Sequence, residues 1–208
     1  MKRDQFGRPQ DLTATQTISH DVLKEKYLKA GESSAEDVYR RVARALASVE
    51  PEAERADHEA LFLENLHAGA IGAGRIMSAA GTTIQATLIN CFVQPVGDCI
   101  QGFDDGGFPG IYEALREAGE TMRRGGGVGY DFSRIRPRGA EVKAMASLAS
   151  GPCSYINVFD QSCSTVESAG ARRGAQMGVL RIDHPDVMEF ITAKRTPGRW
   201  NNFNVSVG

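Results

Sequence analysis

The segment RRGGGVGYDFSRIRPRG, residues 123–139, contains a glycine run, a predicted strand and a basic loop in succession. Consecutive glycines carry no Cβ, so the backbone there can adopt positive φ and a ligand can approach it closely. Apolar residues then take every second position, the period of a half-buried strand: Val128, Tyr130, Phe132. The alternating arginines that follow favour a phosphorylated ligand, although a solvated connection has the same composition. Spacing to other residues must decide between the two.

Composition and charge limit the functions that the whole chain can have. With 208 residues, of which 41% are hydrophobic, it can form one substantial core as one domain or part of a larger one. A net charge of −2 argues against a general nucleic-acid binder. No apolar run approaches the roughly 20 residues that span a bilayer, and the first residues lack the hydrophobic centre of a signal peptide. We expect a cytoplasmic protein without a membrane partner.

The chain has four cysteines: Cys91, Cys99, Cys153 and Cys163. In the cytoplasm their thiols stay reduced unless they take part in a redox reaction. None forms a CxxC pair, so we expect no zinc site and no other metal site.

Helical periodicity dominates the first third of the chain. It predicts a short helix from residue 18 to 28, a second capped by Ser33 or Ser34, and a third that begins at Pro51. Small residues predict a loop at 69–81. We therefore expect a helical N-terminal region at residues 1–75 and a second region at 76–208.

Strand and helix patterns alternate in the second region, which argues for an α/β fold with a parallel sheet or barrel. The run at residues 88–93, which precedes Pro95, is typical of a buried strand. The other predicted elements are a helix at 108–124, a strand at 128–132, a helix that begins at Pro152, a strand at 179–182, a helix at 185–194 and a strand at 203–207.

Five blocks of sequence together resemble one family, the large catalytic chain of ribonucleotide reductase. They are INCFVQPVGD at 89–98, the segment at 123–139, GARRGAQMGVL at 170–180, DHPDVMEFI at 183–191 and NNFNVSV at 201–207. The first two are similar to the class II, adenosylcobalamin-dependent branch. The resemblance implies a helical N-terminal part followed by the first strands of a ten-stranded α/β barrel. The chain is then the N-terminal portion of a reductase, with an incomplete barrel.

The resemblance also implies roles for three residues at the substrate. Cys91 matches one of two cysteines that form a disulfide as they supply electrons to the ribose. Asn90 matches a position that borders the ribose and phosphate, and Gly127 matches the glycine that lies against the sugar. Without the surrounding blocks, Cys91 would be interpreted as a small buried hydrophobe and Gly127 as a flexible turn.

A second set of residues matches the family's allosteric specificity site. Asp98 lies seven positions after Cys91, and Arg136 nine after Gly127, as in that site. The resemblance implies that the carboxylate binds the effector's ribose and that the guanidinium binds its phosphates, which a planar fork of donors suits. A turn residue and an exposed charge are the alternatives. Residues 137–149 would form a loop that closes on the effector, and Arg172 or Arg173, in the loop at 170–176, could contact either nucleotide.

Several parts of the family's chemistry are absent from these 208 residues. They are the NxCxE block with its radical cysteine, the second reducing cysteine, a later phosphate loop and the C-terminal CxxC. The complete enzyme would use adenosylcobalamin to reduce a ribonucleoside di- or triphosphate. We expect this chain not to turn over alone. Its expected partners are the ribonucleotide, a dNTP or ATP effector, a thioredoxin-like reductant and the missing C-terminal part, in the same gene or a split one. A homodimer through the helices at 111–124 and 152–167 is possible.

Three other interpretations stay open. A fragment of the diiron-dependent class I large subunit would share the barrel and both effector residues, but not the dependence on adenosylcobalamin. A non-catalytic regulatory module would bind effector without complementing a C-terminal partner. A remnant that does not fold would leave a sticky strand edge near Val205 and Val207.

Overall fold

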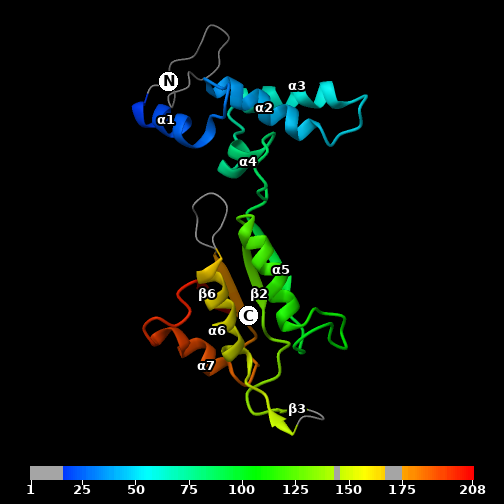
Figure 1. The fold of residues 1–208 in the computed structure, drawn as a ribbon, viewed down its shortest axis with the longest axis vertical. Coiled ribbons are helices and arrows are strands. Elements are labelled where there is room, and N and C mark those ends of the chain that lie inside the picture. The colour runs from blue at the N-terminus through cyan, green and yellow to red at the C-terminus, as the bar shows by residue number, and fades with distance from the viewer. Residues whose placement is uncertain (1–15, 143–145, 167–174) are drawn as a thin grey trace. The chain divides into compact units, whose positions relative to one another are not determined.

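The computed structural model describes residues 16–142, 146–166 and 175–208. They form two compact units that divide between Ile84 and Gln85, later in the chain than the predicted boundary at residue 75. Each unit has its own hydrophobic core. Figure 1 shows helices in the first unit, and strands with helices in the second. Within the described residues, every helix is too short or too polar to cross a bilayer.

The first unit is helical, as predicted. Its elements are α1 Thr17–Val22, the π-helical turn η1 Leu23–Tyr27, α2 Ala35–Ala47, α3 Arg55–His67 and α4 Gly74–Ala79. Ser34 caps α2: its hydroxyl accepts a hydrogen bond from the Asp37 N–H at 3.3 Å, and the Asp37 carboxylate accepts one from the Ser34 N–H at 2.9 Å. This capping box satisfies two backbone donors at the start of the helix. The apolar face of α2, with Val38 and Val42 buried, then packs against its neighbours.

The predicted loop at residues 69–81 is wrong at its centre, because Gly74–Ala79 forms helix α4. Met77 on this helix is only 4% exposed and belongs to the same core as Val38. A helix this short is marginal by itself, so packing against α2 stabilises it where local propensity would not.

The second unit contains a four-stranded parallel sheet. Its strands are β1 Cys91–Pro95, β2 Gly127–Asp131, β5 Gln176–Leu180 and β6 Phe203–Val207, in the spatial order β1-β2-β5-β6. The helices between them are α5 Ile111–Arg123, α6 Pro152–Thr165 and α7 Val187–Thr192 with the 3₁₀ turn η2 Ala193–Arg195. Two short antiparallel strands, β3 Glu141–Val142 and β4 Ser147–Leu148, lie between β2 and α6.

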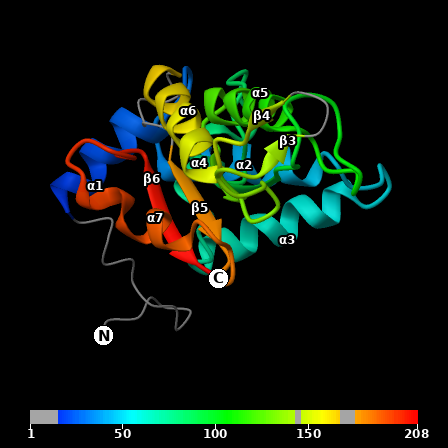
Figure 2. The same cartoon turned by 90° about the horizontal axis from the view of Figure 1, so that it is seen from below.

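All three connecting helices cover the same face of this sheet. The strands follow one another across the sheet without a reversal, so right-handed crossovers place every helix on one side. In agreement, side chains from α5, α6 and α7 share one buried cluster with those of the strands. Figure 2 shows α5 and α6 together on one side of β5 and β6. A parallel sheet with helices on a single face is the arrangement of an α/β barrel wall, and the predicted fold class is confirmed for these strands.

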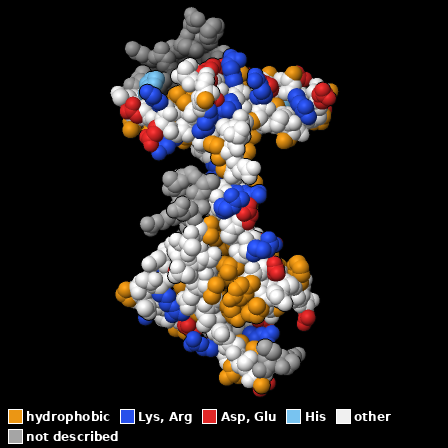
Figure 3. Space-filling view, viewed as in Figure 1, with side chains coloured by type: hydrophobic (Ala, Val, Ile, Leu, Met, Phe, Trp, Pro, Cys, Tyr) orange, Lys and Arg blue, Asp and Glu red, His pale blue; other side chains and the backbone are white. Residues whose placement is uncertain are grey.

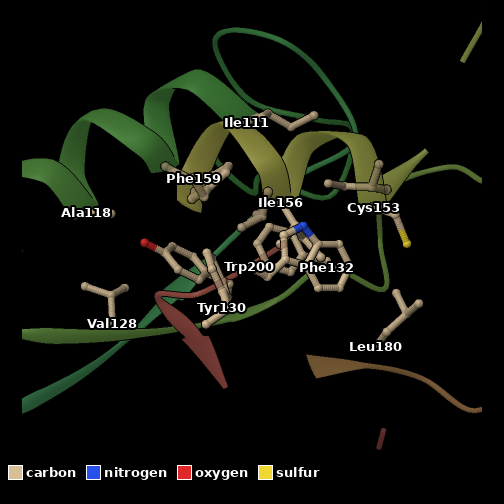
Figure 4. Close-up of a cluster of buried hydrophobic side chains, with 14 of the residues drawn as sticks. Ile111, Ala118, Val128, Tyr130, Phe132, Cys153, Ile156, Phe159, Leu180 and Trp200 are labelled. Atoms are coloured by element: carbon tan, nitrogen blue, oxygen red, sulfur yellow. The ribbon is translucent and has the colours of Figure 1, made fainter. Parts of the chain in front are cut away.

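Aromatic side chains form the centre of this core (Figure 4). The Tyr130 ring packs edge-on against Phe159 with centroids 4.8 Å apart, and Phe132 lies 5.3 Å from Tyr130. The buried Tyr130 hydroxyl donates to Gln176 Oε1 at 2.7 Å, and Gln176 Nε2 donates to the Phe159 carbonyl at 3.0 Å. Burial raises the pKa of Tyr130, so its hydroxyl stays a neutral donor. This chain of bonds satisfies the polar groups that the core encloses.

The prediction of a buried strand at 88–93 is wrong in position and in burial. The strand begins at Cys91, and Ile89 and Val93 are 66% and 88% exposed. The physical reason is that the helices cover only one of the two faces of β1, which lies at the edge of the sheet that the described strands form. The strand at 203–207 is confirmed, whereas β5 begins at Gln176, earlier than predicted, and α7 is shorter than its predicted span.

Candidate functional site

Cys91 and Gly127 lie side by side on the face of the sheet that the helices leave uncovered. They are paired in the parallel register of β1 and β2, and paired residues point to the same face. The next pair on this face is Val93 with Gly129, which continues to Met177 on β5. Cys91 is exposed and forms no disulfide. The uncovered face therefore presents a free thiol next to a strip of bare backbone.

Asn90 immediately precedes β1 and joins the two strands. Its carbonyl accepts a hydrogen bond from the Gly127 N–H at 2.7 Å. A Cβ at Gly127 would lie 3.3 Å from the Ala175 carbonyl oxygen and 3.5 Å from that of Asn90. The backbone around Gly127 is thus already crowded, and a side chain there would also occupy the space over the sheet beside Cys91.

Each glycine of the run at 125–127 is suited to its position for a different structural reason. Gly125, with φ +89°, ends α5 in a Schellman motif: its N–H donates to the Met122 carbonyl, and the Gly126 N–H donates to that of Thr121. A Cβ at Gly126 would lie 2.7 Å from the Phe92 ring. The sequence pattern predicts ligand approach for the whole run, but only Gly127 has a position that fits it.

Asp98 and Arg136 form an ion pair at the ends of β1 and β2. The Arg136 Nε donates to Asp98 Oδ2 at 2.8 Å, and the Arg136 backbone N–H donates to Oδ1 at 3.0 Å. The guanidinium also donates from its NH1 nitrogen to the Glu141 carbonyl at 3.2 Å. Both side chains are about one-third exposed, at 29% and 34%. The structure therefore brings the two predicted effector residues together and leaves them accessible to a ligand.

Asp104 holds the loop that carries Asp98, and the sequence analysis does not identify it. Its carboxylate accepts backbone N–H groups of Gly106, Phe108 and Asp98, and the guanidinium of Arg134 at 3.1 Å. The hydrogen bond from Phe108, with those from Asp98, Arg134 and Gly106, lowers the pKa of Asp104 to about 2. The Arg134 guanidinium also lies over the Phe108 ring, 3.9 Å from its centroid. An aspartate before glycines predicts a turn, but these long-range partners have no signal in the sequence.

The other three cysteines lie away from the uncovered face. Cys153 and Cys163 are buried in the core under the helices, and burial raises the pKa of both thiols, that of Cys153 to about 12. Burial, together with nearby Asp104, also raises the pKa of the Cys99 thiol. Cys91 is thus the exposed thiol of this chain. Among the described residues no group of three or more His, Cys, Asp or Glu could hold a metal ion.

Two predicted effector residues, Arg172 and Arg173, lie outside the described residues, as does the centre of the predicted loop at 137–149. The described ends of that loop form β3 and β4.

The parallel sheet with helices on one face is the arrangement found in part of an α/β barrel. Residues 89–208 match the model of the ribonucleotide reductase barrel domain, and residues 14–85 match that of the ribonucleotide reductase all-alpha domain. The chain therefore belongs to the ribonucleotide reductase family. The two matches meet near the boundary between the two compact units.

Among individual relatives, the chain is 36% identical over 199 residues to a vitamin B12-dependent ribonucleoside-diphosphate reductase of Mycobacterium tuberculosis. That match covers 90% of this chain and 27% of the relative. A protein of the same name from Thermoplasma acidophilum is 42% identical over 130 residues, covering 62% of this chain and 16% of the relative. The chain thus spans about a quarter or less of the length of these relatives.

The fold also matches a solved structure, the Actinobacillus ureae class Id ribonucleotide reductase alpha subunit. The TM-score is 0.68 at 23% sequence identity, and the match covers 92% of this chain and 33% of that subunit. At this identity the likeness is one of fold alone.

Proposed function

We propose that this chain supplies the first part of the catalytic barrel of a ribonucleotide reductase that converts ribonucleotides to 2′-deoxyribonucleotides. In it, Cys91 is a redox-active thiol, Asn90 and Gly127 border the substrate, and Asp98 and Arg136 bind an effector nucleotide. The observation that carries this proposal is the register of Cys91 with Gly127 on the uncovered face of the sheet. Geometry of this kind lets a sugar lie on bare backbone next to a thiol.

The step assigned to Cys91 is electron donation. Oxidation of two thiols to one disulfide releases two electrons and two protons, which balances loss of the ribose 2′-hydroxyl as water and addition of hydrogen at C2′. Cys153 and Cys163 are buried under the opposite face, and Cys99 lies beside Gly110 at the start of α5, so we place the second thiol outside this chain. Exposure of Cys91 also lets an external dithiol protein reduce the disulfide again.

The step assigned to Asp98 and Arg136 is recognition of a nucleoside triphosphate. A guanidinium can form paired hydrogen bonds with phosphate oxygens, and a carboxylate accepts from ribose hydroxyls. In the structure, Arg136 donates from Nε to Asp98 and from NH1 to the Glu141 carbonyl. We assign the remaining N–H groups of the guanidinium to the anion. An effector that engages both residues would replace part of this ion pair with its own contacts.

The relatives' names point to adenosylcobalamin as the cofactor of the complete enzyme. We assign this part of the barrel to nucleotide binding and reduction, and cofactor binding to other parts of the complete enzyme. A second copy of the chain is a further proposed partner, since hydrophobic side chains gather over α5 (Figure 3).

The redox role of Cys91 can be tested in a chimera of the M. tuberculosis relative in which residues 89–208 of this chain replace the matching segment. We expect turnover of ribonucleoside diphosphate with adenosylcobalamin and a dithiol, measured as deoxynucleotide formed, and loss of turnover to background in Cys91→Ser. Cys99→Ser is the matched control and should retain activity. Equal activity of the two variants would contradict the redox role.

The class II and class I alternatives are separated by the same measurement on the complete enzyme that contains this chain, because the cofactor dependence of the chimera comes from the relative's own segments. Turnover that requires adenosylcobalamin supports the first, and turnover that requires a second radical-generating subunit supports the second. The isolated 208-residue chain should be inactive under both conditions.

A further inference from the structure

The block DHPD, residues 183–186, has no role in the function proposed above. It follows β5, and its second residue reaches the loop after β2. His184 is only 7% exposed, and its Nε2 lies 2.9 Å from the Ile135 carbonyl oxygen. Its Nδ1 accepts a hydrogen bond from the Asp186 N–H at 3.0 Å. Because Nδ1 is an acceptor, the ring proton is on Nε2, from which it donates to Ile135.

Asp186 binds the same loop at Arg138, three residues after Ile135. Its Oδ2 accepts a hydrogen bond from the Arg138 N–H at 2.8 Å. Gly151, which precedes α6 with φ +79°, provides the space for this bond. A Cβ at Gly151 would lie 2.6 Å from Asp186 Oδ2 and 2.8 Å from the Arg138 nitrogen. Three separate segments of the chain thus meet around one hydrogen bond.

Arg136 lies between these two attachments. Its own N–H donates to Asp98, and Ile135 before it is buried at 2% exposure. Pro137 after it has no N–H to bind, fixes its own φ, and restricts Arg136 to an extended conformation. The backbone on both sides of the guanidinium is therefore held in place by partners from distant parts of the chain.

We propose that His184 and Asp186 are positioning residues, which hold the loop at 135–138 so that Arg136 presents its guanidinium to the phosphates of a nucleoside triphosphate. This inference rests on the effector role of Arg136 proposed above. A guanidinium binds phosphate best in a defined orientation, and a loop that is already ordered loses less entropy when the anion binds. Neither residue touches the ligand.

The test is a calorimetric titration of the 208-residue chain with dTTP. Asp186→Ala should weaken dTTP binding by about threefold to tenfold, the effect of one lost hydrogen bond. Asp186→Asn should restore affinity close to that of the wild type, because an amide oxygen still accepts from the Arg138 N–H. Asp183→Ala is the matched control from the same block, since exposed Asp183 binds Arg181 and not this loop. It should bind dTTP as the wild type does.

His184→Asn provides a second, independent variant if Asp186→Ala does not fold. Its shorter amide can still accept from the Asp186 N–H but cannot reach the Ile135 carbonyl, and it should weaken dTTP binding similarly. Wild-type affinity in the folded variants, or a loss in Asp186→Asn as large as in Asp186→Ala, would overturn the positioning role alone. Absence of dTTP binding by the wild type, or unchanged affinity in Arg136→Ala, would overturn the effector site and this inference with it.

Discussion

Single carboxylates organise the loops that carry the proposed effector site. Asp98, Asp104 and Asp186 each accept a backbone N–H from a residue of these loops, and each bond joins or closes a segment without regular structure. A buried or half-buried N–H without a partner is costly, so these side chains replace the hydrogen bonds that a helix or strand would supply. The positions of Asp98 and Arg136 therefore depend on side chains outside this ion pair, those of Asp104 and Asp186.

Asp104 makes the stability of these loops depend on pH. Its pKa falls from an ordinary 3.8 to about 2 in the folded chain, chiefly through the hydrogen bond from Phe108. A lowered folded-state pKa stabilises the protein above the unfolded-state value, and this contribution is lost as pH falls from about 4 to about 2. We expect Asp104→Asn to lower the urea midpoint at pH 7, and the difference from the wild type to shrink across that window. Exposed Asp105→Asn is the control, and a difference that persisted at pH 2 would contradict the assignment.

At the scale of elements, local patterns predict what local forces determine. The helix cap at Ser33 or Ser34, the helix after Pro152 and the alternation along β2 all involve near neighbours, and all three predictions are confirmed, the cap at Ser34. Helix α4, predicted as a loop, and the exposed strand β1, predicted as buried, depend on the packing of distant elements, and both predictions are wrong. The glycine run shows both effects: its helix-ending role is local, whereas contact of Gly126 with Phe92 exists only after β1 and α5 pack together.

The helices of the first unit are joined by one arginine. Arg41 on α2 binds the Glu32 carboxylate and the backbone carbonyls of Tyr27, Met77 and Ala80, and its side chain is 12% exposed. Lysine keeps the charge but cannot reach several acceptors at once. We expect Arg41→Lys to lower the free energy of unfolding by about 2 kcal/mol in urea titrations.

Its neighbour Arg40 provides the control, because this 60% exposed side chain pairs with Glu36 on the surface. Arg40→Lys should change the free energy of unfolding by no more than about 0.5 kcal/mol. Equal effects of the two substitutions would show that Arg41 does not join the helices.

For the whole second unit, the order of sequence blocks predicts a barrel wall, and the alternation along β2 predicts the buried side of that strand, but no local pattern tells which residues of β1 lie on the covered face of the sheet. That depends on the crossovers, which place α5, α6 and α7 on one side. Val93 and Val128 illustrate the difference. Both are valines in neighbouring strands, yet the first is 88% exposed and the second 3%. The site residues can be placed on the uncovered face only once the three-dimensional register is known.

This asymmetry yields a test of the architecture. Val128→Lys would place a charge in the core beneath the helices and should destabilise the chain by more than about 4 kcal/mol, or prevent folding. Val93→Lys would place the same charge on the uncovered face and should change the free energy of unfolding by about 0.5 kcal/mol or less. Urea unfolding followed by circular dichroism compares the two. A large loss in Val93→Lys would mean that the face bearing Cys91 is covered in this chain, and a ribonucleotide could not then reach the thiol without displacing what covers it.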